Sequence, residues 1–330
     1  MKKKRLLKIK HLVLIVLCFF ALTFLALCVI SRNSLAIRSA AEEYICYPMR
    51  AAIAAVSSLI PIPVFELLVI ILPIPIFISV IKFSRRGGTP VFPILLLALL
   101  SVTYAITLGV GGGVDSEALS AENDRQDLIC AEEYLLERVN TLSLSVDCES
   151  LDVKAVRDFL GERTVTPKRS LFPRLLTRSR IFASLYFPTV EIVFNGSAPS
   201  FVSVFSVAHE IMHFRGVVRE DEATLYAYLA LSESNDAHLS YSASLYAFII
   251  IGRGLDSAEY SSFVSRLHAL PRAQLLEYYD FVSKGNTPIG RLSDKLNDGA
   301  VSIRDGRGNA SYANAALLIA QSIKENKLCN

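Results

Sequence analysis

Five consecutive residues, from His209 to His213, combine the side-chain types and the spacing that a catalytic metal centre requires. They read His-Glu-Ile-Met-His. Residues four positions apart share one face of an α-helix, so the imidazoles of His209 and His213 can bind one metal ion. Glu210 lies beside them and can reach a water molecule on that metal. The H-E-x-x-H pattern therefore predicts two zinc ligands and a glutamate that acts as general base.

The residues around this motif indicate a buried helix. Val207, Ala208, Ile211, Met212 and Phe214 are all uncharged. Two buried imidazoles and a buried carboxylate need polar partners, because an unpaired polar group is costly in an apolar interior. A metal ion would supply those partners. The alternative, a surface helix with two unrelated histidines, does not account for the apolar neighbours.

A catalytic zinc ion takes three protein ligands and keeps one position for water, so a third ligand is needed. The next predicted helix, 219–232, begins with three carboxylates at positions 220 to 222. Successive helix residues point about 100° apart, so the three cannot all face the metal. The side of this helix that carries Ala223 can approach the motif helix closely, and it also carries Glu220 and Thr224. We predict Glu220 as the third ligand and Thr224 as its hydrogen-bonding neighbour, with Glu222 as the alternative ligand.

The motif region resembles known families. His209-Glu-Ile-Met-His followed by Glu220-Asp-Glu-Ala-Thr resembles the gluzincin metallopeptidases, in which two histidines and a downstream glutamate hold zinc. The longer run 208–223 resembles the bacterial domain-of-unknown-function 3810 family. This resemblance implies three membrane spans, a zincin-like domain and a zinc-dependent, peptidase-like protein. Thr224 stands where the pattern usually has Asn or Asp, a departure that affects the expected hydrogen bond but not the metal ligands.

The composition indicates a membrane protein. Of 330 residues, 52% are hydrophobic and only 20% charged, and the mean hydropathy is +0.42. The apolar residues are concentrated in three segments that are long enough to cross a bilayer, 11–30, 63–82 and 91–110. We therefore expect three N-terminal transmembrane helices, the second of them kinked at Pro73. A cleaved signal peptide is the alternative for the first segment.

The distribution of positive charge predicts the orientation. Lys and Arg residues are clustered before the first segment and again in the connector 82–88. The positive-inside tendency places both clusters in the cytoplasm. We therefore expect a membrane domain at 1–113 and an extracytoplasmic domain at 114–330 of a multi-pass cell-membrane protein. Because the net charge of +3 comes largely from the first cluster, it does not indicate a nucleic-acid partner.

The outer domain is predicted to be helical, with a small β-element. Expected helices include 121–143, 152–161, 199–215 and 219–232, and the segment 178–194 is expected to hold one or two short strands. The clearest strand, 190–194, could be the sheet edge on which an extended peptide docks. Cys130 and Cys148 could form a disulfide if the compartment is oxidising. The fold class is therefore mainly α, with three transmembrane helices and a zincin-like domain.

The function that follows is a membrane-anchored zinc peptidase. Zn²⁺ held by His209, His213 and Glu220 would activate a water molecule, and Glu210 would move its proton. The expected partners are a peptide or protein substrate and the lipid bilayer, and the oligomeric state stays open.

Three alternatives keep parts of this interpretation. The first is a non-catalytic zinc-binding sensor or interaction module. The second is an intramembrane protease, which would need the motif at bilayer depth although Arg215, Arg219 and Glu220 follow it closely. The third is a transporter built around Glu66, which leaves the metal motif unexplained. A donor for the oxyanion is not identified, and Tyr241, Tyr246, His238 and Tyr312 are its candidates.

Overall fold

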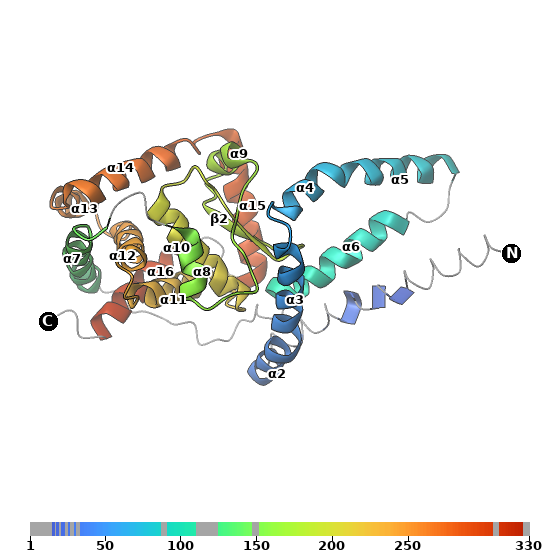
Figure 1. Ribbon diagram of the computed structural model, residues 1–330, viewed down its shortest axis with the longest axis horizontal. Helices are drawn as coiled ribbons and strands as arrows, with labels where there is room; N and C mark the ends of the chain where they lie inside the picture. Colours follow the sequence, from blue (N-terminus) through green and yellow to red (C-terminus); the bar gives the residue numbers. More distant parts are fainter. Residues whose placement is uncertain are drawn as a thin grey trace.

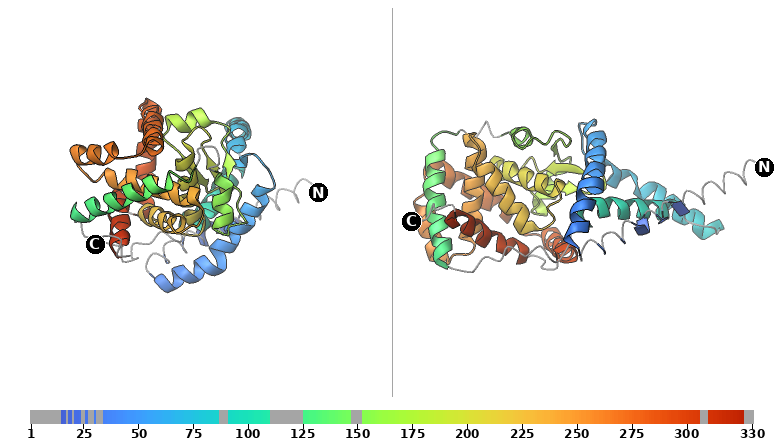
Figure 2. Two further views of the ribbon diagram at one scale, coloured as in Figure 1. Left: turned by 60° about the vertical axis from the view of Figure 1, so that its left-hand side comes forward. Right: turned by 90° about the horizontal axis from the view of Figure 1, so that it is seen from below.

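The computed structural model describes residues 34–86, 91–109, 125–146, 152–305 and 310–325, with a few residues between 15 and 30. Figure 1 shows a helical body around one small sheet, from which a group of apolar helices projects on one side. The right-hand view in Figure 2 shows the same separation. The fold is therefore mainly α with a small β-element, as the sequence predicts.

Helical segments make up the described chain from Leu35 to Gly109. They are α2 (Leu35–Ala41), the π-helical segment η1 (Glu42–Cys46), α3 (Tyr47–Ser58), α4 (Val64–Ile71), α5 (Pro73–Arg86), α6 (Val91–Tyr104) and the π-helical segment η2 (Ala105–Gly109). Helices α4 and α5 follow each other with a break at Leu72, directly before Pro73. A proline ring removes a helical hydrogen bond and clashes with the preceding turn, so the break lies where the sequence predicts a kink.

One helix in the described part of the chain is long and apolar enough to cross a membrane. It is Val64–Arg85, formed by α4 and α5, and only 6% of its most apolar window is buried inside the protein. This length and exposure favour membrane association. The expectation of three spanning helices is therefore wrong for the residues that can be examined. The first expected span, 11–30, lies largely outside the described residues.

The third expected span forms a shorter apolar helix instead. Its apolar stretch is Pro93–Thr107, which is shorter than the roughly 20 residues that a helical span requires. Its last residues, Ala105, Ile106 and Thr107, are buried and pack against α3 and η1. Hydropathy cannot reveal this packing, because an apolar side chain scores the same whether lipid or protein covers it.

The body contains the remaining helices and three short strands. These are α7 (Arg125–Leu142), α8 (Val153–Phe159), β1 (Lys168–Arg169), α9 (Pro173–Arg178), β2 (Ala183–Tyr186), β3 (Glu191–Phe194), α10 (Ser200–Phe214), α11 (Glu220–Ser232), α12 (Ala237–Gly252), α13 (Ser257–Ser265), α14 (Ala269–Ser283), α15 (Pro288–Asp305) and α16 (Ala310–Glu325). Helix α10 lies at the centre, where it packs against α8, α11, α12 and β2. Nearly all of its side chains are buried, as the apolar residues around its motif predict.

The sheet has the strand order β1-β3-β2, with β1 parallel and β2 antiparallel to β3. Strand β3 is therefore the middle strand, and the expectation that the segment 190–194 forms a docking edge is wrong. The edge next to α10 is β2, which pairs with β3 in the register Leu185 to Ile192. The strand order depends on contacts distant in sequence, so the local pattern of apolar residues could not predict it.

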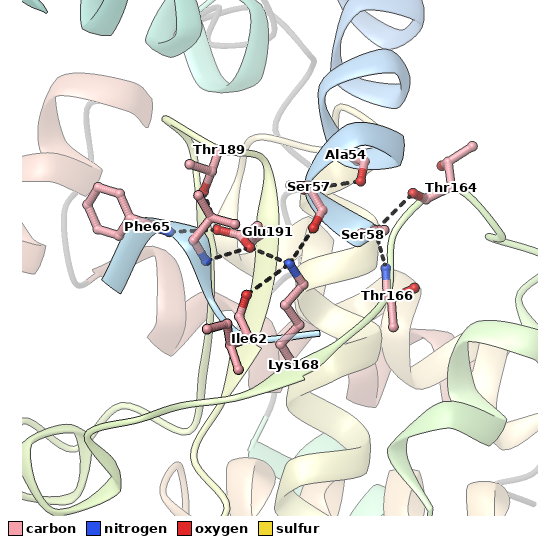
Figure 3. Close-up of polar contacts among 11 residues, drawn as sticks. Ala54, Ser57, Ser58, Ile62, Phe65, Thr164, Thr166, Lys168, Thr189 and Glu191 are labelled. Atoms are coloured by element: carbon pink, nitrogen blue, oxygen red, sulfur yellow. Dashed lines mark hydrogen bonds and ion pairs between the residues drawn. The ribbon is translucent and has the colours of Figure 1, made fainter. Parts of the chain in front are cut away.

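A buried ion pair within the sheet is hydrogen-bonded to the start of α4, as Figure 3 shows for Phe65. Lys168 of β1 pairs with Glu191 of β3, and both side chains are almost fully buried. The carboxylate of Glu191 also accepts hydrogen bonds from the backbone N–H groups of Val64 and Phe65, each at 2.9 Å. A carboxylate at a helix N-terminus satisfies N–H groups that have no partner inside the helix. The apolar helix Val64–Arg85 therefore begins at a fixed position on the sheet.

Glu66 makes a second connection between α4 and the body, in which the carboxylate belongs to the helix and the hydrogen-bond donors belong to the body. It lies in the first turn of α4, is buried, and accepts hydrogen bonds from the Ser170 hydroxyl and the Leu171 N–H, each at 2.7 Å. The Tyr186 hydroxyl lies 3.5 Å from the same carboxylate. The partners that account for the burial of Glu66 thus belong to the body of the protein.

Cys130 forms a disulfide, and its partner lies outside the described residues. The pairing of Cys130 with Cys148 therefore stays a prediction. The expected domain boundary at Gly113 also falls outside the described residues, and the division into 1–113 and 114–330 stays a prediction as well.

Candidate metal centre

The motif lies at the C-terminal end of α10. This helix ends where Gly216 adopts a left-handed conformation, with φ of +95°. The N–H of Gly216 donates to the carbonyl of His213, and the N–H of Val217 donates to the carbonyl of Met212. This pair of hydrogen bonds is a Schellman motif, which glycine favours because it has no Cβ. The tight turn brings the chain back at once, so that α11 starts close to the two histidines.

Three side chains meet between α10 and α11. The potential ligand atoms of His209, His213 and Glu220 all lie within 4.8 Å of one another. The Oε2 atom of Glu220 is 3.1 Å from Nε2 of His209 and 3.5 Å from Nε2 of His213. The alternative ligand, Glu222, forms an ion pair with Arg219 at 2.9 Å. The structure thus brings together the three residues that the helix geometry selects.

Each histidine is oriented through its other ring nitrogen. Nδ1 of His213 lies 2.6 Å from the carbonyl oxygen of Val217, which can only accept, so Nδ1 carries the proton. The Thr224 hydroxyl donates to the carbonyl of Glu220 at 2.7 Å and lies 3.2 Å from Nδ1 of His209. Because its single proton is used there, the hydroxyl accepts from His209. Both Nε2 atoms then present a lone pair toward Glu220, the arrangement that metal-binding imidazoles require.

Asp221 fixes the start of α11 but does not face the two imidazoles. It is fully buried, and it accepts hydrogen bonds from Arg219 at 3.2 Å and from Asn314 of α16 at 2.7 Å. A carboxylate in the first helical turn is also stabilised by the helix dipole. Asp221 therefore holds the turn in which Glu220 lies.

Glu210 is held by the neighbouring strand. Its Oε2 atom accepts a hydrogen bond of 2.7 Å from the backbone N–H of Leu185 in β2. In an antiparallel pair, every second residue of a strand exchanges backbone hydrogen bonds with its partner strand. Phe182, just before β2, accepts such a bond from Asn195, so Leu185, three residues later, belongs to the other set. The N–H of Leu185 therefore points away from β3. The carboxylate is thereby fixed between the helix motif and the edge strand.

The three clustered side chains and Glu210 line one cavity of about 1070 Å³. Strand β2 forms one wall, and α15 contributes Ile289, Leu292 and Leu296 to another. Phe65 of α4 and Tyr104 of α6 line the same cavity, so it extends to the ends of the projecting helices. A space of this size can hold a segment of several residues of an extended peptide.

Tyr186 is a cavity residue that the sequence does not single out. It follows Leu185 in β2, and its ring contacts Phe65 with 4.7 Å between the ring centroids. Burial is the main cause of its raised pKa, and the carboxylates of Glu66 and Glu210 add to it. The phenol therefore stays protonated at neutral pH and can donate a hydrogen bond. The local signal was only its place in the predicted strand segment 178–194.

The four residues considered as oxyanion donors lie in different places. Tyr246 lines the cavity and stacks on Phe205, with 4.3 Å between the ring centroids. Tyr241 is buried and donates to Gln274. His238 pairs with Asp236 at the start of α12, and the side chain of Tyr312 lies outside the described set. Only Tyr246 among those that can be placed shares the cavity with the histidines.

Two imidazoles and one carboxylate form a donor set that zinc accepts, with a fourth position left for water. The two protonated Nδ1 atoms and the inward Nε2 atoms fit such an ion. The carboxylate of Glu220 also offsets part of the charge of a divalent cation. His209, His213 and Glu220 are therefore the residues that could hold a metal.

Comparison with known proteins identifies one family. The family model described as "Protein of unknown function (DUF3810)" matches residues 43–319. No curated protein matches the chain, and no solved structure does. The resemblance to gluzincin metallopeptidases finds no counterpart in these comparisons and stays a prediction. The family match extends from η1 to α16 and includes α10, α11 and the cavity between them, so the chain belongs to the DUF3810 family.

Proposed function

We propose that this protein is a zinc-dependent peptidase anchored in the membrane. The observation that carries the proposal is the convergence of two imidazole Nε2 atoms and one carboxylate oxygen beside Glu210. His209, His213 and Glu220 would hold the ion and leave one position for water, the arrangement of catalytic rather than structural zinc sites.

The position of Glu210 suits a general base. Bound zinc would polarise the scissile carbonyl and lower the pKa of a water molecule. Glu210 would take a proton from that water and deliver it to the leaving amine. The Leu185 N–H holds Oε2 of this carboxylate, and Oε1 is left to exchange the proton.

Strand β2 suits an extended peptide. The backbone groups of Ala183 and Leu185 point away from β3 and toward the side where Glu210 lies. The Leu185 N–H binds Glu210, so the groups left for a substrate are the N–H and C=O of Ala183 and the C=O of Leu185. In the described part of the chain no strand covers this side of β2. A substrate could pair with it by backbone hydrogen bonds, which would fix its scissile bond relative to Glu210 and would require little of its side chains.

The proposal includes a multi-pass membrane protein with its C-terminal domain outside the cytoplasm. The apolar helix Val64–Arg85 supports membrane anchoring. The disulfide at Cys130 supports an oxidising compartment for the body, because cytosolic thiols are kept reduced. A reporter enzyme that is active only outside the cytoplasm, fused after residue 330, tests the orientation. Activity of a cytoplasmic reporter at the same position would contradict it.

The experiment that tests the chemistry combines metal analysis with hydrolysis of a peptide library by the full-length protein in detergent. Glu210→Gln should keep the metal and abolish hydrolysis, whereas His213→Ala should lose both. Glu222→Gln is the matched control from the same acidic turn, and it should keep both. Zinc in the wild type together with no Glu210-dependent hydrolysis would instead favour a non-catalytic zinc-binding module.

A further inference from the structure

We infer that the substrate is a polypeptide segment held next to its own membrane anchor, with apolar residues beside the scissile bond. This inference rests on the proposed peptidase function and adds the class of substrate and the place of cleavage. It starts from the position of the cavity relative to the projecting apolar helices.

Two neighbouring residues of the edge strand β2 make two contacts: one binds the proposed general base, and the next touches the first turn of the apolar helix. Leu185 binds Glu210 through its N–H. The ring of the next residue, Tyr186, packs at a tilt on the ring of Phe65, the second residue of the helix Val64–Arg85. A strand advances about 3.3 Å per residue, so the contact with the base and the contact with the apolar helix are only a few ångströms apart along β2.

This junction is rigid. Glu191 of β3 accepts hydrogen bonds from the N–H groups of Val64 and Phe65, as Figure 3 shows. Lys168 pairs with the same carboxylate and also donates to the carbonyl of Ser57 at 2.7 Å. Moving the start of the apolar helix away from the sheet would break the hydrogen bonds of Val64 and Phe65 to buried Glu191 and the hydrogen bond of Lys168 to Ser57. The cavity is therefore held next to the first turn of that helix.

A second apolar helix reaches the cavity in the same way. Tyr104, at the end of α6, packs edge-to-face on Phe187, with 5.9 Å between the ring centroids. Both rings line the cavity, as does Phe65. Aromatic side chains at the ends of apolar helices are typical of the boundary between lipid and water. Tyr104 thus lines the cavity together with Phe65 at the start of the helix Val64–Arg85.

The wall formed by α15 presents apolar side chains beside the polar residues Ser293, Asp294 and Asn297, and it is open to solvent. Ile289, Leu292 and Leu296 of α15 line the cavity, and Leu292 and Leu296 are 58% and 65% exposed. Their spacing places them along one side of the helix. Exposed leucines inside a cavity favour an occupant that covers them with apolar side chains. The opposite wall offers backbone hydrogen bonds from β2, so the occupant is a peptide rather than an acyl chain alone.

Attachment of the substrate to the bilayer should increase its rate of cleavage. A segment attached to the bilayer by a short spacer samples the cavity mouth at an effective concentration of the order of millimolar, far above that of a free peptide. This advantage is lost if the spacer is too short to reach β2 from the bilayer, or much longer than the distance between the bilayer and β2. Tethered substrates should therefore be cleaved at least about 10-fold faster than free ones at equal total concentration, with an optimum spacer length.

The test uses the full-length protein in phosphatidylcholine vesicles loaded with zinc. One fluorogenic peptide with Leu on both sides of the scissile bond is supplied free, on a transmembrane helix, or on a palmitoyl chain, with spacers of about 5, 15 and 40 residues. Faster cleavage of either tethered form with an optimum spacer supports the inference, and the two anchors show whether a protein or an acyl anchor is preferred. Equal rates for free and tethered peptides would overturn it while leaving the peptidase proposal intact. Absence of Glu210-dependent cleavage of every form would overturn the peptidase proposal and the inference with it.

A matched pair of variants tests the apolar wall. Leu296→Gln in α15 should raise the KM for the Leu-flanked tethered peptide several-fold and leave bound zinc and Tm unchanged. Leu276→Gln in α14 is the control, because Leu276 is equally exposed at 65% but does not line the cavity. A photoreactive residue beside the scissile bond should also crosslink to α15 in the Glu210→Gln protein, which binds without cleaving. Equal KM values for both variants and no crosslink to α15 would contradict the assigned wall.

Discussion

Arg50 of α3 donates a hydrogen bond of 2.8 Å from Nε to the carbonyl of Phe214, the last residue of the motif helix α10. Its guanidinium also binds the carbonyl of Ile106 and the carboxylate of Glu42, and the side chain is almost fully buried. A helix C-terminus carries unpaired carbonyls and a partial negative charge, which a cation stabilises. One arginine thus links the C-terminal end of the His-Glu-Ile-Met-His helix to the segments α2 to η2.

Arg50→Met is expected to destabilise the protein strongly. It leaves the carboxylate of Glu42 and two carbonyls without their buried partner, and breaking such a pair typically costs about 3–5 kcal/mol. The expected result is a markedly lower Tm in detergent, measured by thermal shift with zinc present. Arg174→Met, at an exposed arginine of α9, controls for the loss of one positive charge and should leave Tm nearly unchanged. Equal Tm values for the two variants would refute the linking role.

Thr224→Val should weaken zinc binding without unfolding the protein. The substitution keeps the shape of the side chain but removes the oxygen that accepts the Nδ1 proton of His209. Loss of such a partner typically lowers metal affinity by about 10–100-fold. A competitive titration with a zinc chelator measures the change. Thr224→Ser retains the hydroxyl and should bind zinc within a few-fold of the wild type, so equal weakening in both variants would argue against this hydrogen bond.

The buried carboxyl group of Glu132 should make the free energy of unfolding depend on pH. It is fully buried in α7, neither carboxylate oxygen has a hydrogen-bond partner among the described residues, and burial raises its pKa well above the usual value. The folded state therefore holds a proton that the unfolded state releases once pH exceeds the ordinary Glu value. Stability is fully present below that value and falls as pH rises toward the folded pKa, by about 1.4 kcal/mol per pH unit.

The measurement compares thermal or denaturant unfolding of the wild type and Glu132→Gln between about pH 4.5 and pH 8, where the ordinary and raised pKa values separate. Glutamine stays neutral, so this variant should lose the decline that Glu132 causes and be the more stable protein at neutral pH. Glu137→Gln is the control on the same helix, because Glu137 is exposed. Parallel pH profiles for wild type and Glu132→Gln would show that Glu132 is not protonated in the folded state.

The disulfide at Cys130 predicts resistance of the native protein to thiol labelling at that position. Protein taken from cells under non-reducing conditions, alkylated and digested, should yield Cys130 only in a disulfide-linked peptide. The mass of that peptide identifies the partner, with Cys148 the residue expected from the sequence. Free, alkylated Cys130 in the native protein would contradict the disulfide and weaken the case for an oxidising compartment.

The sequence by itself determined the features that depend on neighbours along the chain. His209 and His213 share a helix face because they are four residues apart. Helix α10 ends just before Gly216, because glycine takes the left-handed turn without strain. The apolar run that begins at Val64 is recognisable for the same reason, since length and composition are local properties.

Tertiary structure alone decided the features that depend on distant segments. Helix geometry favoured Glu220 but left Glu222 as an alternative, and the packing of α11 on α10 decided between them by placing Glu220 beside the histidines and Glu222 beside Arg219. Strand pairing made β2 the edge and β3 the centre, and protein contacts rather than lipid covered the end of the third apolar segment. The physical reason is common to all of these. The chemistry of a side chain follows from its residue type alone. Its neighbours in the folded protein depend on packing between distant segments, which the local periodicity of the sequence does not reveal.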